Sequence, residues 1–158
     1  YTTLFRSTGV QGRLFLRKLD HVMIYFLIAG TYTPICTISL GGMLSGRVML
    51  AVIWTMALLG TGFTLFWIKM PRALTSIIYL VMGWTAIFAI YPLHAVMNSV
   101  SFAMLLAGGI LYSIGGVLYA LKWPGRNNKY FGCHEIFHVF IVLGSVCHFV
   151  MIYHILGT

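Results

Sequence analysis

Acidic residues are almost absent from this sequence: its 158 residues include two, Asp20 and Glu135. Charged residues of all kinds make up 8% of the chain, whereas about 25% is usual for a soluble domain. Cysteine is scarce too, and the three cysteines form no Cys-x-x-Cys pair, which argues against a disulfide framework and a cysteine-based zinc site. Tyr1 leads directly into a polar, basic segment, so no cleavable signal peptide is visible. These shortages argue against an ordinary soluble domain.

Apolar residues dominate instead, at 60% of the chain. A helix that crosses a membrane needs about 20 mostly apolar residues, and five segments of this kind follow one another. They cover roughly residues 20–40, 48–68, 73–91, 100–121 and 134–155. Pro34 should kink the end of the first segment. The sequence therefore predicts an all-α integral membrane helix bundle that forms a single domain over residues 1–158.

The ten lysines and arginines are distributed unevenly among the loops, and the net charge is +8. If the five segments cross the membrane in alternate directions, nine of the ten fall on one side and Arg47 falls on the other. Because lysine and arginine collect in cytoplasmic loops, we expect the basic loops to be cytoplasmic and the C-terminus to lie outside. This topology in the cell membrane accounts for the charge, so no nucleic-acid partner is expected.

Small residues also recur in the fourth segment. Gly109, Ser113 and Gly116 fall on one helical face, and small residues allow two membrane helices to approach closely. We therefore expect this face to pack tightly against a neighbouring helix.

The polar residues of the first and last segments are the strongest functional signal. Asp20 begins the first segment, and His134, Glu135 and His138 begin the last one, so the topology puts them all at the cytoplasmic ends. Ionisable groups in membrane helices are costly and usually functional. Residues four apart share a helix face, so His134 and His138 are placed to bind one metal ion, and imidazole suits zinc. A third ligand must then come from another helix.

Simpler explanations exist for each of these residues. The two histidines could lie at the membrane interface, Asp20 could be the N-cap of its helix, and Glu135 could favour the helix dipole. His21 points about 100° away from Asp20 and is expected at the interface, whereas His148 could line an internal cavity.

Two metal-dependent hypotheses follow from the residues alone. In the first, the His-Glu-x-x-His string at residues 134–138 is an intramembrane zinc protease motif in which Glu135 is the general base. In the second, the histidines bind zinc in a different kind of membrane protein and Glu135 is incidental. Helical phase does not decide between them.

Two stretches of the sequence resemble a known family. KLDHVMIYFLIAGTYTP (residues 18–34) and HEIFHVFIVLGSVCHF (residues 134–149) are similar to the third and seventh helices of the hemolysin III family, bacterial relatives of the adiponectin receptors. The resemblance implies a seven-helix protein whose helices three to seven correspond to the five segments. The chain has no initiator methionine, so we expect it to begin inside a longer protein.

The resemblance also implies a Zn²⁺ ion with His134 and His138 as ligands, and with Asp20 holding the water on the metal. A further histidine ligand belongs to helix two of the family, and residues 1–7 contain no histidine. That ligand could lie upstream, or it could be replaced, in which case Asp20 could bind the metal directly. Glu135 has no role in the family pattern.

Relatives of the family suggest a function for such a centre. They imply a zinc-dependent hydrolase that acts on a membrane lipid amide or ester, with Asp20 as the catalytic group. The alternative is a non-enzymatic, zinc-stabilised receptor, pore former or regulator of membrane state. The oligomeric state is not predicted.

Overall fold

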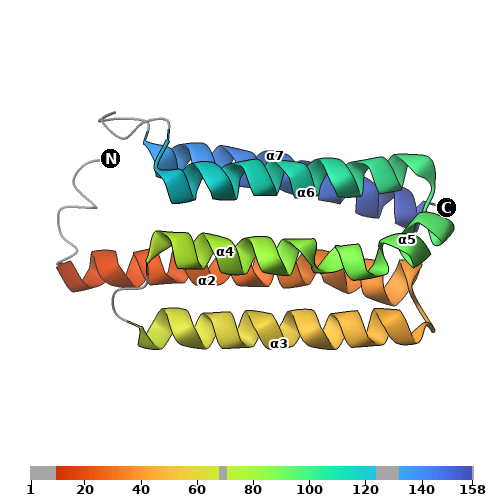
Figure 1. The fold of residues 1–158 in the computed structure, drawn as a ribbon, viewed down its shortest axis with the longest axis horizontal. Coiled ribbons are helices and arrows are strands. Elements are labelled where there is room, and N and C mark those ends of the chain that lie inside the picture. The colour runs from red at the N-terminus through yellow and green to blue at the C-terminus, as the bar shows by residue number, and fades with distance from the viewer. Residues whose placement is uncertain (1–9, 68–70, 124–131, 158) are drawn as a thin grey trace.

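The computed structural model describes residues 10–67, 71–123 and 132–157, and within these ranges every regular element is a helix. The chain runs through α2 (Val10–Pro34), η1 (Ile35–Ser39), α3 (Leu44–Phe66), α4 (Arg72–Trp84), η2 (Thr85–Ala89), α5 (Ile90–Val96), α6 (Ser99–Leu121) and α7 (Cys133–Leu156). The long helices lie side by side with nearly parallel axes (Figure 1). The prediction of an all-α bundle is confirmed.

Five stretches of helix are long and apolar enough to cross a membrane. They are Phe15–Ser39, Leu44–Phe66, Ala73–Val96, Ser99–Leu121 and Cys133–Leu156. Large apolar side chains such as Phe63, Phe66 and Phe88 are more than half exposed, as expected where lipid rather than water surrounds the bundle. The number and order of the predicted segments are therefore confirmed.

The first and third segments are longer than predicted. Helix α2 begins at Val10, ten residues before the expected start. The polar residues before Asp20 make this part of the chain less apolar, but they do not end the helix. The third segment continues to Val96 through η2 and α5, although the predicted segment ended at residue 91, just before Pro92. Pro92 is the third residue of α5. The N–H groups of the first helical turn have no carbonyl partner within the helix, so a proline is tolerated there.

Proline also marks a change of helix type after α2. Pro34 is the last α-helical residue, and the wider π-helix η1 follows it directly. The expected distortion at Pro34 is thus a transition from α-helix to π-helix.

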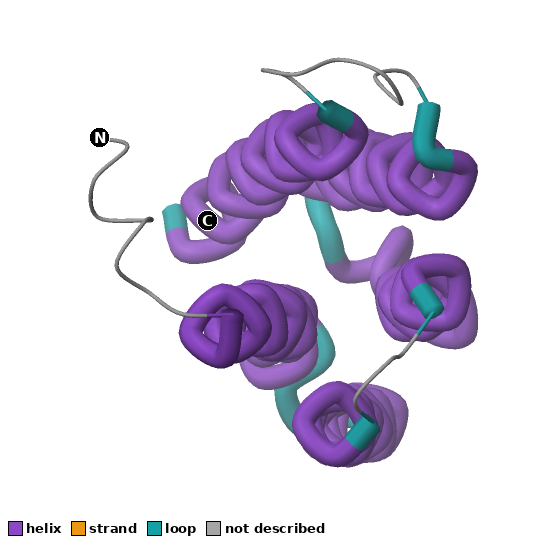
Figure 2. The backbone as a smooth tube through the Cα atoms, turned by 90° about the vertical axis from the view of Figure 1, so that its left-hand side faces the viewer, coloured by secondary structure: helices purple, strands orange, loops and turns teal. Residues whose placement is uncertain are grey.

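The helices form two neighbouring groups. Helices α6 and α7 lie together on one side of the bundle, and α2, α3 and α4 lie on the other (Figures 1 and 2). The start of α2 and the start of α7 lie at the same end of the bundle (Figure 1), as strict alternation requires. This arrangement brings Asp20 and the first histidines of α7 to a similar depth. Which side of the membrane this end faces remains a prediction.

Glycines bring α6 and α7 into close contact, but not on the predicted face. A Cβ atom on Gly115 would lie 2.7 Å from Cβ of Phe140, and one on Gly144 would lie 2.5 Å from the Tyr112 ring. At Gly109 a Cβ atom would meet nothing within 4 Å, and Gly109, Ser113 and Gly116 line a cavity instead. The expected close packing thus fails at Gly109 but holds at Gly116, which is buried and where a Cβ atom would lie 3.5 Å from Leu80 of α4. Helical spacing identifies a face but not the neighbour that each residue of the face meets.

Candidate metal centre

Asp20 of α2 meets His134 and His138 of α7 at one end of the bundle. The Nε2 atoms of the two histidines are 3.2 Å apart. Nε2 of His138 lies 3.3 Å from Oδ1 of Asp20, and Nε2 of His134 lies 3.6 Å from Oδ2. Within the described residues, these three form the one histidine, cysteine or acidic cluster suited to holding a metal ion. The structure therefore brings together the three residues that the sequence singled out.

Helix geometry explains the convergence. The two histidines are four residues apart in the first two turns of α7, so their side chains stack along one face. Their rings meet edge to face, with centroids 4.5 Å apart. Asp20 lies ten residues inside α2, so the explanation of Asp20 as an N-cap is wrong. Its carboxylate faces the positive end of the α7 dipole, which favours the negative charge.

The spacing of the three side chains fits a zinc ion. Two ligands on a tetrahedral zinc with bonds of about 2.0–2.1 Å are roughly 3.3 Å apart. The two Nε2 atoms are 3.2 Å apart and Nε2 of His138 lies 3.3 Å from Oδ1 of Asp20, and both separations are close to that value. The 3.6 Å separation joins His134 to the other carboxylate oxygen, Oδ2. Oδ2 of Asp20 is also buried without a hydrogen-bond partner in the described structure, which is costly for a carboxylate. A cation among the three residues would satisfy this oxygen.

The exposure of the site suits a centre that stays open on one side. The side chains of His134 and His138 are 42% and 39% exposed, and that of Asp20 is 30% exposed. A catalytic zinc keeps one position for water or substrate, whereas a structural zinc is enclosed by four protein ligands. The three residues leave at least one position for another group.

His21 packs beside Asp20 of the candidate centre, a position that the sequence did not reveal. Its side chain is 12% exposed, and Nδ1 lies 3.7 Å from Oδ2 of Asp20. Nδ1 also lies 2.7 Å from the carbonyl of Arg17, to which it donates, so Nε2 is the acceptor. The hydroxyl of Tyr119 lies 3.4 Å from that Nε2. The ring turns inward between α2 and α6, and whether His21 lies at the membrane interface stays a prediction.

Two further aromatic residues complete this support. The hydroxyl of Tyr79 donates to the carbonyl of His21 at 2.9 Å, which ties α4 to α2 beside the site. Phe137 stacks on Tyr119 with ring centroids 4.7 Å apart, which ties α6 to α7. Aromatic residues are common in apolar helices, so no sequence pattern distinguished Tyr79, Tyr119 or Phe137.

Glu135 lies outside the cluster and stabilises the start of its own helix. Its side chain is exposed, and Oε2 accepts a hydrogen bond from the backbone N–H of Gly132 at 2.9 Å. This contact forms half of a capping box at the start of α7. The structure therefore supports the simpler explanation of Glu135, as a residue that stabilises the helix start.

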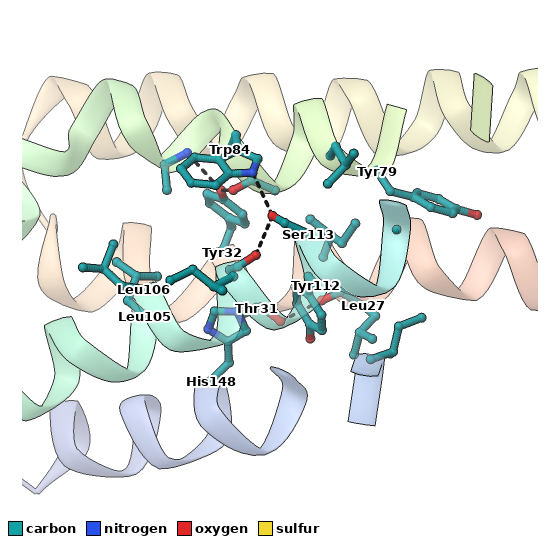
Figure 3. A pocket seen from close by; sticks show the side chains of 18 of the residues that line it. Leu27, Thr31, Tyr32, Tyr79, Trp84, Leu105, Leu106, Tyr112, Ser113 and His148 are labelled. Atoms are coloured by element: carbon teal, nitrogen blue, oxygen red, sulfur yellow. Dashed lines mark hydrogen bonds between the residues drawn. The ribbon is translucent and has the colours of Figure 1, made fainter. Parts of the chain in front are cut away.

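A cavity of about 180 Å³ lies between α2, α4, α6 and α7 (Figure 3). Its walls are almost entirely apolar, and Tyr79 and Phe137 line it close to the histidine–aspartate cluster. His148 lines it farther along α7, as the sequence analysis suggested. The candidate metal centre thus has an apolar cavity beside it.

Comparison with protein families gives a match over residues 4–149 to the family described as haemolysin-III related. The chain belongs to the haemolysin III family. The two stretches that carried the resemblance lie at both ends of the matched region, and the site residues lie within it. With five helices in its described part that could cross a membrane, the chain is a multi-pass membrane protein.

Individual relatives agree with this membership. Hemolysin-3 of Bacillus cereus is 40% identical over 141 residues, which cover 89% of this chain and 61% of the relative. The hemolysin-3 homolog of Bacillus subtilis (strain 168) is 39% identical over 148 residues, which cover 94% and 66%. A yeast protein named as an ADIPOR-like receptor, from Saccharomyces cerevisiae, is 30% identical over 63 residues, 37% of this chain and 20% of the relative. No solved structure matches this chain.

Proposed function

We propose that this haemolysin III protein is a zinc-dependent hydrolase that cleaves an amide or ester bond of a membrane lipid. The observation that carries the proposal is the convergence of Asp20, His134 and His138 beside an apolar cavity. The chain spans 61% and 66% of the length of the two bacterial relatives, so the proposal concerns the whole protein to which it contributes this site.

The donor set favours zinc as the metal. Two neutral imidazoles and a carboxylate match the nitrogen and oxygen ligands of catalytic zinc sites. Zinc supplies a Lewis acid that polarises a carbonyl and generates a nucleophile from water at neutral pH. A further ligand from outside the described residues is compatible with the open side of the cluster.

Asp20 is the proposed general base. Its two oxygens face different histidines, so the carboxylate can bind through one oxygen and accept a proton at the other. His21 donates to the Arg17 carbonyl, and this bond fixes its ring with Nδ1 3.7 Å from Oδ2 of Asp20. The ring packs beside the carboxylate and makes no hydrogen bond to it. The apolar cavity would accept an acyl chain and exclude water from it.

A protease of the His-Glu-x-x-His type is the weaker proposal. In that mechanism Glu135 must act on the reacting water, yet its carboxylate is exposed and accepts a hydrogen bond from Gly132. Asp20 lies within 3.6 Å of both histidines. The geometry therefore favours Asp20 over Glu135 as the catalytic acid or base.

We further propose that the centre lies at the cytoplasmic side of the cell membrane. Arg17 and Lys18 precede Asp20 in α2, and the helix ends next to the other predicted cytoplasmic loops lie at the same end of the bundle (Figure 1). Lipids of the inner leaflet would then reach the site.

Zinc content and lipid hydrolysis test the proposal together. The full-length protein is purified as wild type, as H134A/H138A and as the control H94A/H154A, which removes two histidines of α5 and of the far end of α7. Elemental analysis should find zinc in the wild type and the control, and much less in H134A/H138A. Release of fatty acid from an amide-linked or ester-linked lipid should follow the same order.

Two results would count against it. Equal zinc in all three proteins would remove the proposed site. The second result has two parts: zinc is lost in H134A/H138A, and none of the three proteins hydrolyses either lipid class. It would support the non-enzymatic, zinc-stabilised alternative.

A further inference from the structure

His148 is a buried histidine in the cavity wall, and its imidazole has no hydrogen-bond partner among the described residues. The residue is 7% exposed, and its Nδ1 is buried without a hydrogen bond. Among the described residues, no hydrogen bond reaches either nitrogen of the ring. Figure 3 shows the side chain rising from α7 toward the cavity. A neutral imidazole carries one N–H donor and one acceptor, and burying Nδ1 without a partner is unfavourable.

The neighbouring helix leaves room for this imidazole. A Cβ atom on Gly108 of α6 would lie 2.7 Å from Cε1 and Nε2 of His148. The ring therefore lies directly over a position without a side chain. Tyr112 flanks it with ring centroids 5.2 Å apart. The ring is held in place by shape and not by hydrogen bonding.

Other polar groups in the cavity wall already have partners. The Tyr32 hydroxyl donates to the Gly83 carbonyl and accepts from the N–H of Ala86. Ser113 donates to the Gly109 carbonyl and accepts from the Trp84 indole (Figure 3). Of the cavity-lining residues in the described part of the chain, His148 is the one with a buried polar side-chain atom that lacks a hydrogen bond. One polar group of a ligand would satisfy it.

The distance from the metal centre sets where that polar group should be. His148 follows His138 by ten residues, which at 1.5 Å per residue is roughly 15 Å along α7. An extended chain advances roughly 1.2 Å per bond, since a residue of three backbone bonds spans about 3.5 Å. A lipid chain that starts at the metal centre would thus bring about its twelfth atom to His148.

We propose that the cavity binds a fatty acyl chain with one hydroxyl group near its twelfth carbon, and that His148 hydrogen-bonds this hydroxyl. The inference rests on the proposed function, because the metal centre fixes the carbonyl end of the chain. The apolar walls contact the rest of the chain, and the imidazole distinguishes a hydroxylated chain from a plain one. His148 is thus a specificity-determining residue.

Competition between two fatty acids tests this inference on the full-length protein. Equal amounts of octadecanoic acid and of its derivative hydroxylated at the twelfth carbon are added, and native mass spectrometry measures which one is bound. We expect the wild type to prefer the hydroxylated acid by about tenfold, as one good hydrogen bond allows. H148F keeps a ring over Gly108 but loses both nitrogens, and its preference should fall to about onefold.

Two further proteins keep the result interpretable if H148F folds poorly. H148Q retains a donor and an acceptor and should retain most of the preference, whereas H154F makes the same change at the end of α7 and should behave like the wild type. An isomer hydroxylated at the second carbon should bind no better than the plain acid. The inference fails if the wild type shows no preference, as when a water molecule satisfies His148, or if H148F keeps the preference.

The two proposals fail separately. A hydroxyl preference without lipid hydrolysis would overturn the proposed enzyme and leave the cavity site. Lipid hydrolysis without any preference for the hydroxylated chain would overturn the proposed role of His148 and leave the proposed enzyme standing.

Discussion

The hydroxyl of Tyr119 in α6 lies 3.4 Å from Nε2 of His21 in α2, and this contact links two helices behind the candidate metal centre. His21 stands beside Asp20, with its Nδ1 atom 3.7 Å from Oδ2. Tyr119 is 2% exposed and also stacks on Phe137. The contact therefore joins the position of Asp20 to that of α7, the helix that carries the two histidines.

Removing this hydroxyl should weaken metal binding without abolishing it. Y119F keeps the aromatic stack on Phe137 but no longer bonds His21. Losing a residue that directly contacts a metal ligand typically lowers metal affinity 10–100-fold. Tyr119 contacts His21, which in turn lies beside Asp20, so we expect zinc affinity to fall by about tenfold at most. Competition with a chromogenic chelator measures the change. Y153F, which alters an exposed tyrosine of α7, serves as the control, and an equal effect of both changes would contradict the prediction.

Asp20 and Glu135 should differ sharply in their importance for turnover. D20N should lower the rate of lipid hydrolysis by about 10²–10⁴-fold, the usual contribution of a general acid or base. E135Q should change it little, because the glutamine oxygen can still accept from the Gly132 N–H. Initial rates at saturating lipid compare the two variants with the wild type. A larger loss in E135Q than in D20N would revive the protease mechanism.

Zinc should stabilise the wild-type protein against heat. A ligand that binds the folded state alone stabilises it by about 2.7 kcal/mol at a hundred times its dissociation constant. Thermal unfolding in detergent should thus shift upward when zinc is added to metal-free wild type and should not shift for H134A/H138A. A similar shift in both proteins would mean that zinc binds elsewhere.

Glycines of α6 and α7 should differ in their tolerance of a methyl group. G144A would put a Cβ atom 2.5 Å from the Tyr112 ring and 3.2 Å from the Gly108 carbonyl oxygen, and overpacking of this kind costs about 1–3 kcal/mol. At Gly109 a Cβ atom meets nothing within 4 Å, so G109A should be tolerated. Unfolding midpoints of the two variants make the comparison, and equal midpoints would refute the packing described for α6 and α7.

The direction of insertion can be read from chemical labelling. In a protein whose three native cysteines are replaced by alanine, M43C lies in the connection between η1 and α3, and W123C follows α6. If the basic loops are cytoplasmic, a membrane-impermeant maleimide applied to intact cells should label M43C but not W123C. The opposite pattern would invert the proposed orientation and move the metal centre to the outer face.

The sequence revealed the candidate metal cluster because polar residues are conspicuous in an apolar background. Helical spacing predicted that His134 and His138 share a face, and charge alternation placed Asp20 at the same end. What could not be predicted depends on how helices meet. The inward turn of His21 places its Nε2 atom against the Tyr119 hydroxyl of α6, a contact between helices that local sequence does not encode. The choice of Gly115 over Gly109 for close contact follows from the way α6 lies against α7.

The helix boundaries could not be predicted from the sequence for a different reason. Arg17 and Lys18 lower the hydrophobicity before Asp20, but they are good helix formers, so α2 extends back to Val10. Pro92 indicated a loop, yet its position in the first turn of α5 is one where a helix tolerates proline. Local composition thus indicated where the chain is apolar, and hydrogen bonding decided where it is helical.

The Tyr32 hydroxyl, which bonds both the Gly83 carbonyl and the Ala86 N–H, has a consequence for how the α4–η2–α5 span survives in lipid. An interrupted helix leaves peptide groups that hydrocarbon cannot solvate, at a cost of several kcal/mol each. A phenol from α2 takes the place of water at this interruption. The desolvation penalty of the interruption is therefore smaller by one carbonyl and one N–H, and the same two bonds tie this part of the span to α2, the helix that carries Asp20.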